Sequence, residues 1–151
     1  MLSFSKTYPL TGEEDTKLLA ESLAKIAEKG DVIFLKGGIG AGKSTFSRFF
    51  IQFFLGTEAE IPSPTFTIVQ TYLTKDFTIW HFDLYRLNHS EEVFELGIED
   101  AFYGGVSLVE WPEKLNIQPS KYLLASFENT EKNRSVKMDY FGDWGKRSNA
   151  I

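Results

Sequence analysis

The feature that most constrains the fold is a glycine-rich turn between an apolar run and a helical pattern. Residues 31–36 read DVIFLK, a short apolar run that predicts a buried strand. The turn GGIGAGKST occupies residues 37–45 and satisfies the pattern G-x-x-x-x-G-K-[ST]. Across residues 43–55 the apolar side chains recur at a helical period. A strand, a glycine-rich turn and a helix in this order predict a phosphate-binding loop (P-loop) in an α/β domain.

Each residue type in this turn has a chemical role. Glycines let the backbone turn tightly and direct N–H groups at phosphate oxygens. The helix that begins at Lys43 adds the positive end of its dipole. The Lys43 ammonium supplies charge for the β- and γ-phosphates, and the Ser44 hydroxyl is a ligand for Mg²⁺. The pattern predicts ATP or GTP bound with Mg²⁺; the alternative is a glycine-rich turn with an incidental Lys-Ser pair.

A P-loop needs an acid at the end of a nearby strand to hold Mg²⁺, directly or through water. Two candidates exist. Glu110 ends the apolar run VSLVE, and Asp83 ends a strand with polar members, residues 78–83. We prefer Glu110 as the acid on the metal side because an apolar strand followed by an acid is the expected pattern. Either residue could instead be a solvated carboxylate at a strand end.

Four further residues have two interpretations each. Thr65, in a Ser-Pro-Thr loop, could sense the γ-phosphate and Mg²⁺ or cap local backbone. Trp111 follows the acid directly and could stack on a base or a partner, or pack in the core. We expect His81 to face a neighbouring side chain on its hairpin rather than to act in catalysis. Arg134 is either a strand-edge charge or a contact to the nucleotide.

The remaining pattern predicts one α/β domain. A helix is expected over residues 13–28, with Thr11 and Glu14 forming a capping box at its start. The other expected elements are a strand at 2–8, hairpins at 66–73 with 77–84 and at 121–128 with 134–141, and helical turns at 90–103 broken at Gly97. We assign residues 1–141 to a single three-layer P-loop NTPase-like domain, with a mixed parallel and antiparallel sheet and helices on its faces. Residues 142–151 are expected to be a frayed polar tail.

Composition limits the function classes. The 151 residues carry a formal net charge of −5, which disfavours unaided binding to DNA or RNA because that affinity comes mostly from Lys and Arg. No cysteine is present, which excludes disulfides and thiolate metal sites. The first residues lack the pattern of a signal peptide, and no apolar run approaches the length of a membrane span. We therefore expect a cytoplasmic protein that does not bind membranes.

Five segments together resemble the TsaE (YjeE) family, the small bacterial ATPase of tRNA threonylcarbamoyladenosine biosynthesis. They are GGIGAGKSTFSRFF (37–50), SPTFTIVQTY (63–72), HFDLYRL (81–87), ELGIEDAF (95–102) and VEWPEKL (109–115). They occur in the family's order and at about its spacing, whereas the C-terminal third matches only loosely. Gly38 stands where an acidic residue is common in the family, and Ser44 replaces the commoner threonine.

The resemblance implies roles for individual residues. Mg²⁺ would be bound by Ser44 and Glu110, and Asp83 would be needed for activity. Thr65 would act as a switch element that senses the nucleotide state. The expected catalytic residues are Lys43, Thr65, Asp83 and Glu110. The expected ATP-binding residues are Glu13, Gly38, Gly40, Ala41, Gly42, Lys43, Ser44, Thr45, Trp111 and Arg134.

The resemblance also implies an activity and partners. The chain would be an ATPase that acts with the TsaD–TsaB pair, which makes threonylcarbamoyladenosine at position 37 of tRNAs reading ANN codons. ATP binding and hydrolysis would reset that complex, and tRNA would be met only through it. We expect slow hydrolysis by the chain alone, because the sequence offers no obvious arginine finger beyond Arg48 and Arg86. The alternatives are a small-molecule kinase with Asp83 as base, and a nucleotide-dependent binding module without meaningful hydrolysis.

Overall fold

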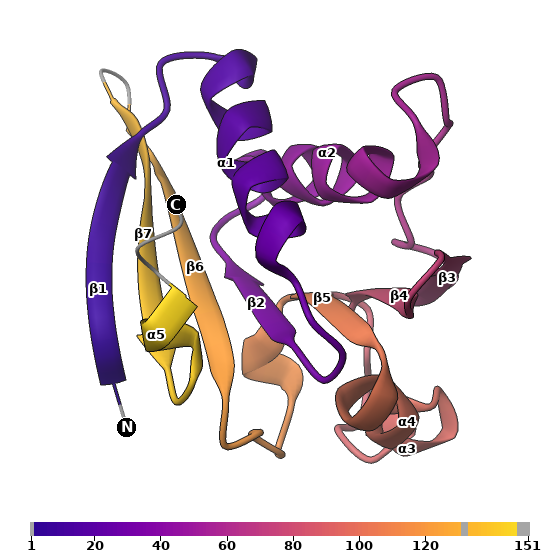
Figure 1. Cartoon of the computed structure of the whole chain (residues 1–151). Coiled ribbons are helices and arrows are strands. Elements are labelled where there is room, and N and C mark those ends of the chain that lie inside the picture. The colour runs from indigo at the N-terminus through magenta and orange to yellow at the C-terminus, as the bar shows by residue number, and fades with distance from the viewer. Residues whose placement is uncertain (1, 131–132, 148–151) are drawn as a thin grey trace.

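The computed structural model describes residues 2–130 and 133–147. The strands found in these ranges form one sheet in the order β1-β7-β6-β2-β5-β4-β3 (Figure 1). Their bounds are β1 Leu2–Pro9, β2 Val32–Lys36, β3 Val69–Leu73, β4 Thr78–Asp83, β5 Val106–Glu110, β6 Tyr122–Asn129 and β7 Arg134–Phe141. The helices are α1 Glu13–Ile26, α2 Lys43–Leu55, α3 Glu92–Glu95, α4 Ile98–Gly104 and α5 Trp144–Arg147, with a 3₁₀ turn, η1, at Pro112–Lys114. None of the helices in the described ranges has the length and apolar character needed to cross a bilayer.

The centre of the sheet is parallel and its edges are antiparallel. Strand β2 lies between β5 and β6, parallel to both, and β4 is parallel to β5. The two hairpins expected from sequence, β3–β4 and β6–β7, are antiparallel and add the outer strands together with β1. Asp83 pairs in register with Glu110, and Leu35 pairs with Glu110 on its other side. The carboxyl ends of β2, β4 and β5 therefore meet at one edge, where the glycine-rich turn begins.

Helices cover both faces of the sheet, which confirms the expected three-layer α/β fold. Side chains of β2 alternate: Ile33 and Leu35 pack in a cluster with α1 and α2, whereas Val32 and Phe34 pack in a second cluster with α3 and α4. Figure 1 shows α1 and α2 together on the first face and α3 and α4 apart from them. Strand β2 is apolar on both faces, so it needs a packed layer of helices on each side of the sheet.

Aromatic side chains attach α2 to the sheet. Phe46 and Phe50 have no exposed surface and their rings lie 6.3 Å apart. Phe46 also meets the ring of Phe127 on β6, edge to face, at 5.9 Å. Burial of each Phe contributes on the order of 1.5–3 kcal/mol. This anchoring fixes the first turn of α2, which carries Lys43 and Ser44, over the edge where the parallel strands end.

Two local expectations for α1 are wrong. The helix ends at Ile26 rather than near residue 28. Its N-cap is Gly12, which makes no side-chain cap, so the expected capping box does not form. Instead the Asp15 carboxylate accepts hydrogen bonds from the Thr11 N–H at 2.8 Å and the Thr11 hydroxyl at 2.6 Å. Asp15, one residue after the expected capping residue Glu14, therefore bonds Thr11 in its place. Its negative charge lies in the first turn of α1, where the helix dipole stabilises it.

The expectation of a frayed tail is wrong for residues 142–147. Trp144 has no exposed surface and belongs to the cluster under α1 and α2. Arg147 makes a bidentate ion pair with the fully buried Asp31, at 2.8 and 2.7 Å. It also donates to the Ile26 carbonyl at the end of α1, at 2.8 Å. This segment therefore belongs to the domain, and residues 148–151 lie outside the described residues.

Candidate nucleotide-binding site

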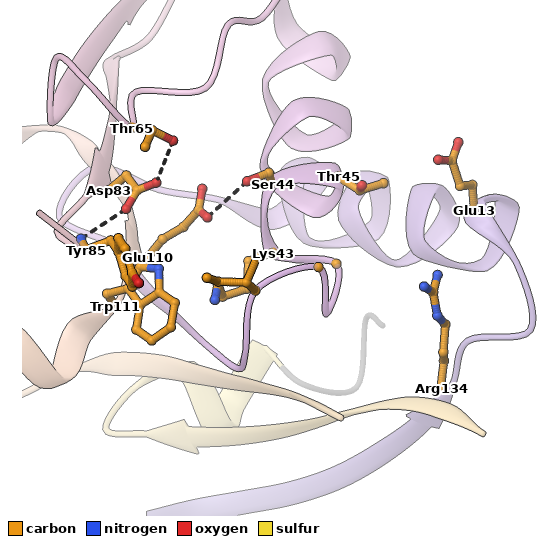
Figure 2. A pocket seen from close by; sticks show the side chains of 13 residues that line it. Glu13, Lys43, Ser44, Thr45, Thr65, Asp83, Tyr85, Glu110, Trp111 and Arg134 are labelled. Atoms are coloured by element: carbon orange, nitrogen blue, oxygen red, sulfur yellow. Dashed lines mark hydrogen bonds between the residues drawn. The ribbon is translucent and has the colours of Figure 1, made fainter. Parts of the chain in front are cut away.

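A cavity of about 460 Å³ opens at the edge where β2, β4 and β5 end. Such a volume is within the usual range for small-molecule sites. Figure 2 shows the residues that line it. They are Glu13, Ile39, Gly40, Gly42, Lys43, Ser44, Thr45, Thr65, Asp83, Tyr85, Glu110, Trp111 and Arg134. Segments far apart in the sequence thus contribute to one site.

The glycine-rich turn places backbone N–H groups at the floor of this cavity. The first hydrogen bond of α2 runs from the Phe46 N–H to the Gly42 carbonyl, at 3.0 Å. The N–H groups of Lys43, Ser44 and Thr45 consequently have no acceptor within the helix. Gly42 adopts φ +117°, and Gly37 adopts φ +147° with the Phe127 carbonyl only 2.9 Å from where a Cβ would lie. Only glycine fits this backbone, which turns the exposed N–H groups toward the cavity.

The Lys43 ammonium is held by backbone and an aromatic ring. Its Nζ donates to the Gly37 carbonyl and, at 3.2 Å, to the Gly38 carbonyl. It also lies 3.9 Å from the centroid of the Trp111 ring, a cation–π contact. Burial lowers the pKa of Lys43, and the charges of nearby carboxylates, Glu110 first, oppose that effect. The ammonium is therefore partly desolvated, and an anion in the cavity would compensate its charge.

Ser44 and Glu110 meet across the interface between α2 and the sheet. The Ser44 hydroxyl donates to Glu110 Oε1 at 3.1 Å. The other carboxylate oxygen, Oε2, lies 2.6 Å from His81 Nε2, and both His81 and Glu110 are 2% exposed. We expected His81 to face a residue of its hairpin, and this is wrong. His81 lies opposite Leu108 on β5, so Glu110, two residues further along, is on the same face.

Asp83 connects the loop at residues 63–68 with the segment after β4. Its Oδ2 accepts from the Thr65 hydroxyl at 3.2 Å, and its Oδ1 accepts from the Tyr85 N–H at 3.1 Å (Figure 2). The Thr65 hydroxyl also lies 2.7 Å from that of Ser63. The loop ends at Ile68, a branched residue at φ +69°, whose carbonyl accepts from the Asp83 N–H. Thr65 is therefore held over the cavity through one carboxylate.

The opposite end of the cavity is lined by Glu13 and Arg134. Figure 2 shows both side chains beyond Thr45, away from Asp83 and Glu110. Glu13 begins α1 and lies 3.9 Å from Arg48. Arg134 begins β7 and is exposed. A residue at this end is far from the acids and can contact only the part of a ligand that extends away from them.

Most of the residues named from sequence come together here, with two exceptions. Gly38 and Ala41 do not line the cavity, and Ala41 is 8% exposed and packs in the core cluster under α2. Sequence reasoning missed Ile39 and Tyr85, both of which line the cavity. Tyr85 follows Asp83 by two residues and packs against Trp111 with the rings tilted and their centroids 4.9 Å apart. Its place in HFDLYRL was the one signal that pointed to it.

The acids of the site do not form a metal cage by themselves. Within residues 2–130 and 133–147, no group of three or more His, Asp or Glu side chains is placed to hold a metal ion. One serine hydroxyl and one carboxylate 3.1 Å apart instead suit a cation that takes its other ligands from phosphates and water. Mg²⁺ in phosphate sites is bound in this way, by few protein ligands.

The comparison that decides the family covers most of the chain. The sequence model described as "Threonylcarbamoyl adenosine biosynthesis protein TsaE" matches residues 10–136. The chain belongs to the TsaE family. Membership is consistent with the order of the segments that carry the site, since all of them fall inside the matched range.

Relatives in the TsaE family extend the comparison. The chain is 49% identical to the tRNA threonylcarbamoyladenosine biosynthesis protein TsaE of Rickettsia felis over 104 residues, 69% of this chain and 61% of that protein. It is 41% identical to the protein of that name from Bacillus subtilis over 106 residues, 70% of this chain and 65% of that one. It is 37% identical to the Haemophilus influenzae protein over 125 residues, 81% and 78% of the two chains. The match thus spans about three fifths of the length of the Rickettsia felis relative.

A solved structure supports the same fold. The crystal structure of Bacillus subtilis YdiB superposes with a TM-score of 0.75 at 28% sequence identity, and the match covers 97% of this chain and 92% of that one. The agreement includes the C-terminal third, where the sequence resembles the family only loosely. The TsaE fold is therefore shared over nearly the whole described chain.

Proposed function

We propose that this TsaE-family chain is a P-loop ATPase that binds ATP with Mg²⁺ and serves threonylcarbamoylation of adenosine 37 in tRNAs reading ANN codons. One observation carries the proposal. The Ser44 hydroxyl and the Glu110 carboxylate lie 3.1 Å apart beside the free N–H groups at the start of α2. A pair of oxygen ligands next to an anion-binding helix end fits a metal–triphosphate complex.

The residues present fit both ligands. Lys43, Ser44 and Thr45 offer N–H donors, and the Lys43 ammonium already lies against the cavity with its charge partly desolvated. Ser44 and Glu110 would hold Mg²⁺, which supplies charge neutralisation between the β- and γ-phosphates. Arg134 would contact the part of the nucleotide that extends away from the acids, because it lines the opposite end of the cavity. Trp111 would contact the nucleotide at the phosphate end, beside Lys43.

Asp83 and Thr65 would connect the γ-phosphate to a moving loop. Thr65 is 3.2 Å from Asp83 and lines the cavity near Glu110, so a ligand there competes for its hydroxyl. Pro64 and Ile68 anchor the loop at 63–68 in the core, whereas Thr65 between them is held by the hydroxyl of Ser63 and the carboxylate of Asp83. The backbone at Ile68 is strained, with φ at +69°. Binding of the triphosphate would therefore order this loop in a new position, and hydrolysis would release it.

Hydrolysis by the chain alone should be slow, since among the described residues no arginine lines the nucleotide cavity on the side of the acids. Arg48 is paired with Glu13, and Arg86 stacks on the exposed Phe66 ring at 4.4 Å. Arg134 lies at the opposite end of the cavity. An arginine that stabilises the developing charge commonly raises the rate of P-loop hydrolases by 10³–10⁵. We therefore infer that the TsaD–TsaB pair supplies or orders the missing group, and that ATP turnover resets that complex.

The rival kinase function is less well supported. A kinase would need Asp83 as a base for an acceptor hydroxyl, but both Asp83 oxygens already accept hydrogen bonds and the side chain is 5% exposed. A base must be free to take a proton from its substrate. The third alternative is a nucleotide-dependent binding module. It differs from the proposed ATPase only in having no meaningful rate of ATP hydrolysis.

Phosphate release assays separate these functions. We expect ATP turnover by the chain alone to be slow, and turnover with the TsaD–TsaB pair to rise by at least 10-fold. Turnover of tens per second with a sugar or nucleoside acceptor and no partner would contradict the proposal and favour a kinase. No turnover in any mixture, with tight ATP·Mg²⁺ binding retained, would favour the binding module.

A further inference from the structure

His81 forms a buried hydrogen bond with Glu110 and has no part in the activity proposed so far. Both side chains are 2% exposed, and their atoms Nε2 and Oε2 lie 2.6 Å apart. They come from neighbouring parallel strands, β4 and β5, at the level where those strands end. Because both backbones are fixed in the sheet and both side chains are buried, the two groups are held in one relative geometry.

The hydrogen bonds around Glu110 fix where each oxygen points. A carboxylate oxygen and an unprotonated ring nitrogen are both acceptors, so the short contact requires a proton, which we place on Nε2. Ser44 donates to the other oxygen, Oε1. Rotation of the carboxylate would break one or both bonds in a buried place, where an unsatisfied polar group costs about 1–3 kcal/mol. His81 thus holds Oε1 toward Ser44 and the cavity.

The second ring nitrogen makes no competing contact. His81 Nδ1 is buried and has no hydrogen-bond partner among the described residues. The His81 side chain also lines a small cavity of about 140 Å³ together with Ser44, Thr45 and Ser63. Nε2 is therefore the ring nitrogen that holds a partner, and that partner is Glu110.

We propose that His81 is the positioning residue of the metal site: its Nε2–H holds Glu110 so that Oε1 is presented to Mg²⁺ beside Ser44. The inference rests on the proposed function, because it assigns a role within the same site. Residues that orient metal ligands in this way typically change metal affinity by 10–100-fold when replaced. His81 itself touches neither the metal nor the nucleotide.

The test measures the gain in affinity that Mg²⁺ brings. Calorimetry with a non-hydrolysable ATP analogue gives Kd in Mg²⁺ and in EDTA, and their ratio defines the gain. We expect His81→Phe to lower this gain about 10-fold while Kd in EDTA changes by less than about twofold. His81→Gln keeps an N–H donor at similar reach, so it should restore the gain to within about threefold. Equal weakening in Mg²⁺ and EDTA would show a structural role and overturn the inference.

Two controls make the result specific. Ser107→Ala removes a buried hydroxyl of β5 that has no hydrogen-bond partner within residues 2–130 and 133–147, and should leave the gain unchanged. In a Glu110→Gln background, His81→Phe should change the gain by less than about twofold, because His81 acts through that carboxylate. A full 10-fold loss in that background would overturn the inference.

The outcomes also distinguish this inference from the proposed function. If wild type binds the analogue without any gain from Mg²⁺, the proposed metal site itself falls, and the role of His81 falls with it. If wild type shows the gain and His81→Phe keeps it, the proposed function stands and only the inference on His81 is overturned.

Discussion

At the scale of single residues, the site contains one buried charge, the Lys43 ammonium, that is not hydrogen-bonded to a carboxylate. Lys43 is 5% exposed and Glu110 is 2% exposed, yet the lysine is held by two carbonyls and a ring rather than by a carboxylate. Burying an ammonium with so little compensation is unfavourable, as its lowered pKa shows. A bound anion would remove that cost, so the free site is arranged for its ligand rather than for its own stability.

Lys43→Ala should therefore abolish nucleotide binding without harming the fold. We expect the affinity for ATP·Mg²⁺, measured by calorimetry, to fall at least about 100-fold, because a charge-assisted contact to phosphate is lost in a partly desolvated place. The melting temperature should not fall by more than a few degrees. Lys25→Ala, which changes an exposed lysine of α1, is the matched control. Unchanged affinity in Lys43→Ala would refute the assignment of the turn.

Thr65→Val tests whether the loop at 63–68 senses the γ-phosphate. Valine keeps the shape but removes the hydroxyl that bonds Asp83. We expect ADP affinity to stay within about twofold, while ATP turnover with the TsaD–TsaB pair drops about 10-fold or more. Stability should fall by about 1 kcal/mol, the typical value of one hydrogen bond. Thr65→Ser retains the hydroxyl and should behave as wild type; equal loss in both variants would point to packing alone.

At the scale of elements, the C-terminal helix α5 fastens parts of the chain that are distant in sequence. Arg147 bonds both oxygens of Asp31 and the Ile26 carbonyl, so it joins the end of α1 to the turn before β2. Asp31 also accepts from the Glu28 N–H at 2.7 Å and lies 3.5 Å from Lys121. The last turn of α1 is thereby held in place by a residue from the C-terminal end of the chain, which satisfies the Ile26 carbonyl.

Arg147→Met should destabilise the protein by about 3 kcal/mol. The change leaves the buried Asp31 with Lys121, 3.5 Å away, as its remaining cation, and breaking a buried pair from one side typically costs 3–5 kcal/mol. Urea unfolding monitored by circular dichroism measures it. Glu28→Gln, which alters an exposed partner 3.9 Å from Arg147, should change stability by less than about 0.5 kcal/mol. A loss below 1 kcal/mol in Arg147→Met would mean that α5 is dispensable.

At the scale of the whole molecule, the aromatic core contains polar atoms that lack partners. The hydroxyls of Tyr72 and Tyr140 are buried without a hydrogen bond among the described residues. Burial raises the pKa of both hydroxyls, and most strongly that of Tyr140. Since the unfolded chain releases these protons near the ordinary value of about 10, the unfolded state binds fewer protons than the folded state above that pH. Stability should therefore fall as pH rises through 10.

Tyr140→Phe should flatten this alkaline loss of stability. Each such tyrosine lowers the free energy of unfolding by up to about 1.4 kcal/mol per pH unit above pH 10. The lowered pKa of Lys43 acts in the opposite direction just below pH 10.5, so the difference between variant and wild type isolates Tyr140. Urea unfolding between pH 8 and 11 should show a smaller slope in Tyr140→Phe and unchanged or higher stability at pH 7. Parallel curves would contradict the prediction.

Much of this molecule was predictable because it depends on local pattern. The bounds of α2 and β5, the break at Gly97 and both hairpins follow from short-range periodicity and turn residues, and the structure confirms them. The glycine-rich turn was predictable for the same reason, since its backbone needs glycine at defined positions. Thr65 and Glu110 were also found from sequence, as polar residues at the ends of recognisable segments.

Tertiary structure decided what depends on the order and register of strands. Sequence placed His81 on a hairpin, but only the parallel pairing of β4 with β5 brings it to Glu110, because the partner strand lies 25 residues or more along the chain. The same holds for Arg147. Its polar neighbours in the sequence predicted a frayed tail, but the fold places it beside the buried Asp31, 116 residues away in the chain. Local sequence determined the glycine-rich loop that can bind a phosphate. Long-range packing determined which charged side chains surround that loop, because a buried charge is paired with whatever the fold places within a few ångströms of it, regardless of separation along the chain.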